Sequence, residues 1–334
     1  MKEEHMRDTS RARWCAGILM GTMALLAAAC AAAAPALRVV VSLPAGGGVD
    51  AMARIVAQGL AKRCDCSVVV ENKPGASGTI AARAVINSSS SEPSILASGN
   101  QEITIAPFLI KDPYYRPMHD LQPLLQVGTV ASVLFAKAGG EWASSAAFLR
   151  SLHRSPAIGI GVPGVGTPMH LALSAVAGEA GGAFLAVPYK GAPGVVMAVL
   201  SQSVAYGTAG LPAVSSLIAN GGVRALAVLG SQSSSLLPGV PAITSYVPLR
   251  EKIPEISYGF FAPSSWPQAR RRQLEADLKA VVQDPDIRKK LERLGIEKPV
   301  MGAAAYEAEL KSQLKYYGHA MARLAKTESG HGHQ

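Results

Sequence analysis

Aromatic side chains and charges are both scarce in this sequence. Phe, Trp and Tyr make up 5% of its 334 residues, and Asp, Glu, Lys and Arg together make up 16%. Cationic residues exceed anionic ones by 9, an excess that suits nucleic acid, an anionic membrane or anionic solutes. The basic clusters at 270–272 and 288–290 are interleaved with acidic residues, as on a solvated helix face. Because aromatic platforms for bases are also lacking, we expect no nucleic-acid partner.

Cysteine is equally sparse. The chain has 4 Cys, of which Cys15 and Cys30 belong to its N-terminal segment. The other two, Cys64 and Cys66, are separated by one residue, and a bridge at that spacing strains the required Cβ geometry. We therefore expect two unpaired thiols near a helix end. C-x-C alone supplies too few ligands for a tetrahedral metal site, so the sequence predicts neither a metal nor a cofactor.

Sequence motifs of familiar enzyme classes are missing as well. There is no G-x-S-x-G elbow, no H-E-x-x-H and no paired-cysteine motif. Residues 159–164 formally match G-x-G-x-x-G, but Pro163 interrupts the turn and the acidic residue of a dinucleotide site does not follow. We expect a non-enzymatic protein. The competing hypothesis is a hydrolase or lyase that uses Asp50 or His170, which needs a nucleophile and a base within hydrogen-bonding reach.

The one long apolar run lies at the N-terminus. Cationic residues, beginning with Lys2, precede an apolar run over 14–34, which ends in the A-x-A pattern Ala34-Pro35-Ala36. These features predict a secretory signal peptide over residues 1–36 and an exported mature chain. Two alternatives remain open, namely lipidation at Cys30 and an uncleaved membrane anchor.

Strand and helix patterns alternate through the rest of the chain. Short β-branched runs are followed by segments with apolar residues at helical spacing, which predicts α/β layers with mostly parallel sheets. The expected strands are 37–42, 67–71, 94–97, 124–127, 132–136, 157–162, 183–189 and 223–229. The expected helices are 50–63, 78–86, 142–153, 167–177, 194–200, 268–282, 285–294 and 303–324.

The mature chain is too long for one comfortable core, so two domains are expected. The glycines at 138–140 and the proline-rich stretch 237–254 are plausible crossovers. If the chain crosses at both, residues 37–137 plus 245–326 form a discontinuous first lobe, residues 138–244 form the second lobe, and residues 327–334 form a flexible tail.

Two glycine-rich loops each connect a strand to a helix, at 44–50 and at 161–168. Glycine lets such a loop curl so that successive N–H groups converge on an anion, and the helix start adds unpaired donors. A carboxylate is a natural occupant, and a matched loop in each half favours a shared cleft. The alternative is that both loops are ordinary turns, in which Asp50 and Thr167 only start a helix.

Several motifs follow one another in an order typical of one family. Residues 39–54 read V-V-V-S-L-P-A-G-G-G-V-D-A-M-A-R, and residues 68–78 read V-V-V-E-N-K-P-G-A-S-G. Shorter motifs follow at 187–191, 223–228, 237–241 and 259–263. Over nearly all of residues 37–325 the chain resembles the Bug-type periplasmic receptors, the solute-binding components associated with tripartite tricarboxylate transporters.

The resemblance implies a periplasmic protein with the two-lobed Venus-flytrap fold and its ligand cleft between the lobes. The implied ligand is a small carboxylate, such as a di- or tricarboxylate, and the implied state is a monomer. Membrane subunits of the transporter are the implied partners, with a sensor kinase as the alternative. Carried over residue by residue, the resemblance gives these ligand-binding residues: Ala45, Gly46, Gly47 and Asp50 in one lobe, Gly164, Gly166 and Thr167 in the other, and Ser77, Thr79, Asn100 and Tyr189 from adjoining loops.

One departure from the family pattern bears on the ligand. Where members commonly read F-D-N, this chain has Thr208-Ala209-Gly210. If the Asp of that motif pairs with the ammonium of an amino-acid ligand, its absence disfavours a cationic ligand here.

Closure of the lobes would bring both donor loops onto one anion, and ligand binding would favour the closed population.

Overall fold

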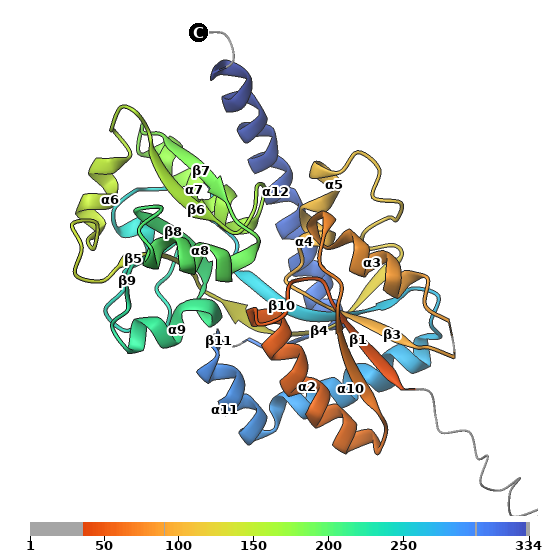
Figure 1. The fold of residues 1–334 in the computed structure, drawn as a ribbon. Helices are drawn as coiled ribbons and strands as arrows, with labels where there is room; N and C mark the ends of the chain where they lie inside the picture. Colours follow the sequence, from red (N-terminus) through yellow and green to blue (C-terminus); the bar gives the residue numbers. More distant parts are fainter. Residues whose placement is uncertain (1–35, 90, 298, 332–334) are drawn as a thin grey trace, which may run out of the picture. The chain divides into compact units, whose positions relative to one another are not determined.

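Two separate β-sheets organise the chain from Leu37 onward (Figure 1). The computed structural model describes residues 36–89, 91–297 and 299–331, with side chains as far as Leu324. Residues 1–35 of the predicted signal peptide therefore lie outside the described residues. The described residues from Leu37 onward form one compact unit that contains both sheets. Among the described residues, no helix combines the length and the apolar character that a membrane span requires.

The first sheet has the strand order β11-β4-β10-β3-β1-β2, with β12 also paired to β4. β1 runs parallel to β2 and β3, whereas β10 runs antiparallel to β3 and β4. Its strands are β1 (Leu37–Val41), β2 (Val68–Asn72), β3 (Ser94–Ser98), β4 (Leu121–Val130), β10 (Ile256–Pro263), β11 (Ile296–Glu297) and β12 (Met301–Gly302).

Helices cover both faces of the first sheet. Val39 and Val41 of β1 share a core with α2 (Gly48–Cys64), α10 (Gln268–Gln283) and α11 (Pro285–Arg293). Val40 points to the other face, where it packs with α3 (Thr79–Ile86) and the start of α12 (Ala303–His331). Because successive side chains of a strand face opposite ways, burial on both faces accounts for the unbroken valine run.

The second sheet has the strand order β7-β6-β8-β5-β9. Its strands are β5 (Ser132–Lys137), β6 (Ile158–Val162), β7 (Phe184–Pro188), β8 (Tyr206–Gly210) and β9 (Val223–Val228). β6 is parallel to β7 and β8, and β5 is antiparallel to β8 and β9. One face packs with α6 (Ser145–Ser151) and α7 (Pro168–Glu179), the other with α8 (Gly191–Leu200) and α9 (Leu211–Ala219).

The chain changes sheet with only Ala131 between β4 and β5. The crossover was predicted after residue 137, which is the end of β5, so the chain changes sheet one strand earlier than expected. A connection of one residue inside an apolar run has none of the glycine or proline that indicates a linker. The return is later than predicted: after η2 (Ile243–Ser245), Ile253 still packs with the second sheet, and β10 of the first sheet starts at Ile256.

Most expected strands and helices are present within a few residues of their predicted bounds, with three differences of note. β8, β10 and α9 were not among the expected elements, since glycine weakens both strand signals and β10 also contains Pro263. The short helices α4 (Gln101–Thr104) and α5 (Ala106–Leu109) and the 3₁₀ turn η1 (Ala76–Gly78) were also not expected. The last helix α12 runs on to His331, into the segment for which a flexible tail was expected.

Cys64 and Cys66 form a disulfide, so the prediction of two unpaired thiols is wrong. The physical reason is the residue between them. Asp65 ends α2 in the left-handed conformation, with φ 46° and ψ 45°, and this turn brings the two Cα atoms to 5.1 Å. That separation lies within the range that a disulfide spans.

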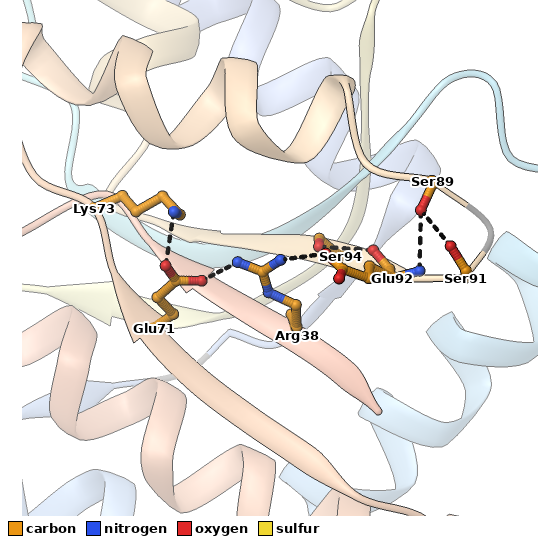
Figure 2. Close-up of polar contacts among 7 residues, drawn as sticks. All are labelled: Arg38, Glu71, Lys73, Ser89, Ser91, Glu92 and Ser94. Atoms are coloured by element: carbon orange, nitrogen blue, oxygen red, sulfur yellow. Dashed lines mark hydrogen bonds and ion pairs between the residues drawn. The ribbon is translucent and has the colours of Figure 1, made fainter. Parts of the chain in front are cut away.

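A polar network links the three parallel strands of the first sheet (Figure 2). Arg38 on β1 pairs with Glu71 on β2, and its Nη1 lies 2.9 Å from a carboxylate oxygen of Glu92, which precedes β3. Lys73 Nζ lies 2.6 Å from the other oxygen of Glu71. These hydrogen bonds, from Lys73 first and then Arg38, hold the pKa of Glu71 below its usual range. The network connects β1 to both of its neighbours at a partly exposed position.

Candidate functional site

A cavity of about 90 Å³ lies where loops of the two sheets meet. The first sheet contributes residues before α2 and α4, and the second sheet contributes residues at the starts of α7, α8 and α9. β10 adds Ile256 and Tyr258. The remaining lining residues are Leu43, Pro44, Gly47, Gly48, Gly99, Gln101, Pro163, Thr167, Pro168, Met169, Gly191, Ala192, Pro193, Gly210 and Ala213.

The two sheets touch beside this cavity. A Cβ placed on Gly48 of α2 would lie 2.8 Å from Pro212 Cβ of α9, and one on Gly191 would lie 3.7 Å from Pro44. The first distance is too short for a real side chain, so glycine at position 48 allows the first turns of α2 and α9 to approach each other. The cavity is therefore bounded by both halves of the chain.

The N-termini of four helices converge on the cavity. α2, α7, α8 and α9 are 17, 12, 10 and 9 residues long, and a first-turn or N-cap residue of each lines it. Three of these starts, those of α2, α8 and α9, have no side-chain cap. Helix N-termini carry unpaired N–H groups and the positive end of the dipole, so their joint field favours an anion.

At the start of α2, Asp50 holds the glycine loop in place. Its carboxylate accepts a 2.9 Å hydrogen bond from the Gly46 N–H and pairs with Arg54 at 3.0 Å. Burial raises the pKa of Asp50, but the hydrogen bonds from Arg54, Gly46 and Asn72 outweigh it and the net shift is downward. The Asp50 carboxylate and the Gly46 N–H are thus engaged within the loop, and Gly47 and Gly48 face the cavity.

At the start of α7, Thr167 is a helix cap and also a cavity residue. Its hydroxyl accepts the His170 N–H at 3.4 Å and donates to the Gly164 carbonyl at 2.9 Å. The Gly166 N–H donates to His170 Nδ1 at 3.0 Å. Thr167 is therefore a helix-starting residue, as one interpretation of the sequence had it, and it also lines the cavity.

Tyr258 places a hydroxyl between the two halves of the cavity. Its Oη lies 2.8 Å from the Cβ position of Gly48 and 3.5 Å from that of Gly210. The side chain is 7% exposed, and burial raises the pKa of its hydroxyl above the usual range, so it is a neutral donor. Among the described residues, nothing hydrogen-bonds to this hydroxyl.

The structure brings two of the predicted ligand-binding residues, Gly47 and Thr167, to the cavity wall. Asn100 instead turns into the core: its amide donates to Ser257 Oγ at 2.5 Å and accepts from Tyr306, while its neighbours Gly99 and Gln101 line the cavity. The others outside the lining are Ala45, Gly46, Asp50, Gly164 and Gly166 in the two loops, Ser77 and Thr79 around the start of α3, and Tyr189, which packs behind α8. A role for these residues in binding stays a prediction.

Most of the lining residues, among them Gly191, Gly210 and Tyr258, were not predicted, and Gly48 was indicated only as part of the loop at 44–50. Gly191 and Gly210 are single glycines at helix starts. The matched motif at 187–191 could have singled out Gly191, whereas Gly210 lies where the chain departs from the family pattern. Tyr258 sits on β10, which was not expected.

A larger cavity of about 360 Å³ lies at the opposite ends of the strands of the second sheet, beside Lys137, Trp142 and Arg154. It adjoins the beginning of β6, whereas ligands in α/β sheets bind at the carboxyl ends of strands. The smaller cavity satisfies that rule for β1, β3, β6, β7 and β8, and we take it as the candidate site.

Comparison with known proteins agrees with this geometry. Residues 52–324 match the family described as the tripartite tricarboxylate transporter family receptor. Protein BugT of Bordetella pertussis is 30% identical over 254 residues, which are 75% of each chain.

Among solved structures, the periplasmic binding protein BugD has a TM-score of 0.77 and 26% identity, over 86% of this chain and 97% of that one. The Rpa4515 protein of R. palustris, solved with adipate, has a TM-score of 0.79 and 22% identity, over 86% of this chain and 96% of that one. These neighbours confirm the predicted two-lobed α/β class.

The matched family and the binding protein BugD are receptors for solutes and not enzymes. This overturns the hydrolase or lyase hypothesis, whose two residues are each held in their own loop, Asp50 by Gly46 and Arg54, and His170 by Gly166. With the motifs, the fold and the match over 52–324 in agreement, the chain belongs to the tripartite tricarboxylate transporter receptor family.

Proposed function

We propose that this protein is a periplasmic receptor that captures a small carboxylate between its two sheets and delivers it to a tripartite tricarboxylate transporter. One observation carries the proposal: four helix N-termini meet at a single cavity lined by both sheets. Such an arrangement stabilises an anion through main-chain donors and dipoles, without a cationic side chain.

The family match and the adipate-bound neighbour support the ligand class and the transporter partnership. Cleavage of residues 1–36 and a periplasmic location complete the proposal, since a receptor of this kind must meet its solute outside the cytoplasmic membrane. The described chain would act as a monomer, with the membrane subunits as its partners.

A ligand screen tests the proposal directly. Purified protein that begins at Leu37 is mixed with mono-, di- and tricarboxylates, amino acids and the matching uncharged amides. The melting temperature is measured for each mixture, and the affinity of each compound that raises it is then measured by calorimetry. We expect carboxylates to raise the melting temperature and amides to leave it unchanged. If no carboxylate binds, or if amides bind equally well, the proposal fails.

A further inference from the structure

The four helix starts around the cavity do not offer equal numbers of donors. Pro168, Pro193 and Pro212 stand in the first turns of α7, α8 and α9. Proline has no N–H, so each of these turns has one donor fewer. In α7 the Thr167 hydroxyl already accepts a further N–H, that of His170.

The start of α2 keeps its full set of donors. Gly48, Val49 and Asp50 all have N–H groups, and the preceding Gly47 supplies no side-chain cap. The buried Tyr258 hydroxyl lies at this same end, 2.8 Å from the Cβ position of Gly48, and donates to no described residue. Unused donors therefore gather at one end of the cavity.

The rest of the wall is largely apolar, with Gln101 and Thr167 as its polar side chains. Met169, Ala192, Pro193 and Ala213 line it from the second sheet, and Ile256 from β10. Within the described part of the chain, no Asp, Glu, Lys, Arg or His side chain lines the cavity. At the position where the family pattern has an Asp-Asn pair, the chain has Ala209 and Gly210, and Gly210 forms part of the wall without a side chain.

We propose that the ligand is a small monocarboxylate with a short, uncharged aliphatic body, an inference that rests on the proposed function. Its carboxylate lies at Gly47 and Gly48 with the Tyr258 hydroxyl, and its body lies against Met169 and Ile256. A second carboxylate would meet helix starts that have fewer free N–H groups because of their prolines and the Thr167 hydroxyl, and an ammonium group would meet no carboxylate. Either charge would lose its water without full compensation, which is unfavourable.

The size of the cavity limits the body of the ligand. Its volume is about 90 Å³. A body of about two to four carbons suits such a space, since a cavity of about 150 Å³ holds the six-carbon ring of benzene.

Four ligands that share one four-carbon chain test the inference: butyrate, succinate, 4-aminobutyrate and butyramide. Calorimetry on the protein from Leu37 should show butyrate binding at least tenfold more tightly than succinate and 4-aminobutyrate, with no binding of butyramide. If succinate binds as tightly as butyrate or more so, this inference fails while the proposed function stands. If no carboxylate binds at all, the proposed function fails with it.

Two variants test the placement of the ligand. Tyr258→Phe removes only the hydroxyl and should weaken butyrate binding about fivefold to tenfold. Ala213→Lys puts a cation on the apolar wall and should narrow or reverse the preference for butyrate over succinate. Gln202→Lys adds the same charge beside the larger cavity and should leave the preference unchanged. Unchanged binding by Tyr258→Phe, or an equal shift in both lysine variants, would overturn the placement.

Discussion

At the scale of single residues, a buried carboxyl group is the most unusual feature of the described chain. Glu102 on α4 is 0% exposed, and its burial outweighs the hydroxyls of Ser98 and Ser42, which act to lower the pKa of its carboxyl group. Burial raises its pKa to about 7. The folded protein thus binds a proton that the unfolded chain releases between about pH 4.5 and pH 7.

The raised pKa of Glu102 predicts how stability depends on pH. Because the folded state binds more protons over this interval, the free energy of unfolding should fall as pH rises from 5 to 7.5, by about 1–3 kcal/mol from this group. Glu102→Gln keeps the size of the side chain and removes the titration. Urea unfolding at both pH values should show a smaller loss in the variant than in the wild type, and parallel losses would contradict the prediction.

Gly48 allows a second residue-scale prediction. In Gly48→Ala the new methyl group meets Pro212 Cβ and Tyr258 Oη, each at 2.8 Å, so α2 and α9 must separate. We expect the affinity for the bound carboxylate to fall by at least tenfold in calorimetry. Gly178→Ala on α7, where a Cβ has nothing within 4 Å, is the matched control and should bind like the wild type.

At the scale of elements, a comparison of two helix caps distinguishes an effect on stability from an effect on ligand binding. The Thr167 hydroxyl caps α7 at the cavity, and the Asp284 carboxylate caps α11 through the N–H groups of Asp286 and Ile287. Loss of either cap should cost about 1 kcal/mol of unfolding free energy. Thr167→Ala should also weaken carboxylate binding, whereas Asp284→Ala should not. Equal affinities in the two variants would mean that Thr167 acts only as a cap.

Elements were predictable where local sequence determines them. The run Val39–Val41 predicted β1, and the glycine-rich loop at 44–50 predicted a helix from Asp50, two residues after the observed start of α2. Both predictions succeed because β-branching and chain reversal act over a few residues. The same logic missed β10, whose glycine and proline are tolerated through pairing with β3 and β4.

The direction in which a side chain of the site points depends instead on contacts with residues far away in the sequence. Asn100 was expected at the ligand because of its loop, but Ser257 and Gln313, more than 150 residues away, hold its amide in the core. Loop position therefore predicted the neighbourhood of the cavity, while the residues that face it were set by tertiary packing.

At the scale of the whole molecule, α12 joins the cores of the two sheets. Tyr306 and Leu310 in its first half pack in the core of the first sheet, and Tyr316, Tyr317 and Ala320 pack with the second. The two sheets are also joined through the single residue between β4 and β5. Shared elements of this kind predict that both sheets unfold together in one transition.

The chain from Leu37 has one tryptophan in each half to test this. Trp266 packs in the core of the first sheet, and Trp142 stacks edge-on against Tyr206 in the second, with ring centroids 5.7 Å apart. Trp142→Phe and Trp266→Phe each leave one fluorescent reporter. We expect the two reporters to give unfolding curves with the same cooperativity, and in each variant the fluorescence midpoint should match that from circular dichroism.

The link through α12 can then be weakened on purpose. Tyr317→Ala removes a ring that is 3% exposed and should cost about 3–5 kcal/mol, while Lys315→Ala on the exposed side of the same helix should change little. If α12 couples the sheets, the tryptophan of the first sheet must report the loss in Tyr317→Ala as strongly as that of the second. A loss seen only by Trp142 would show that the sheets unfold independently.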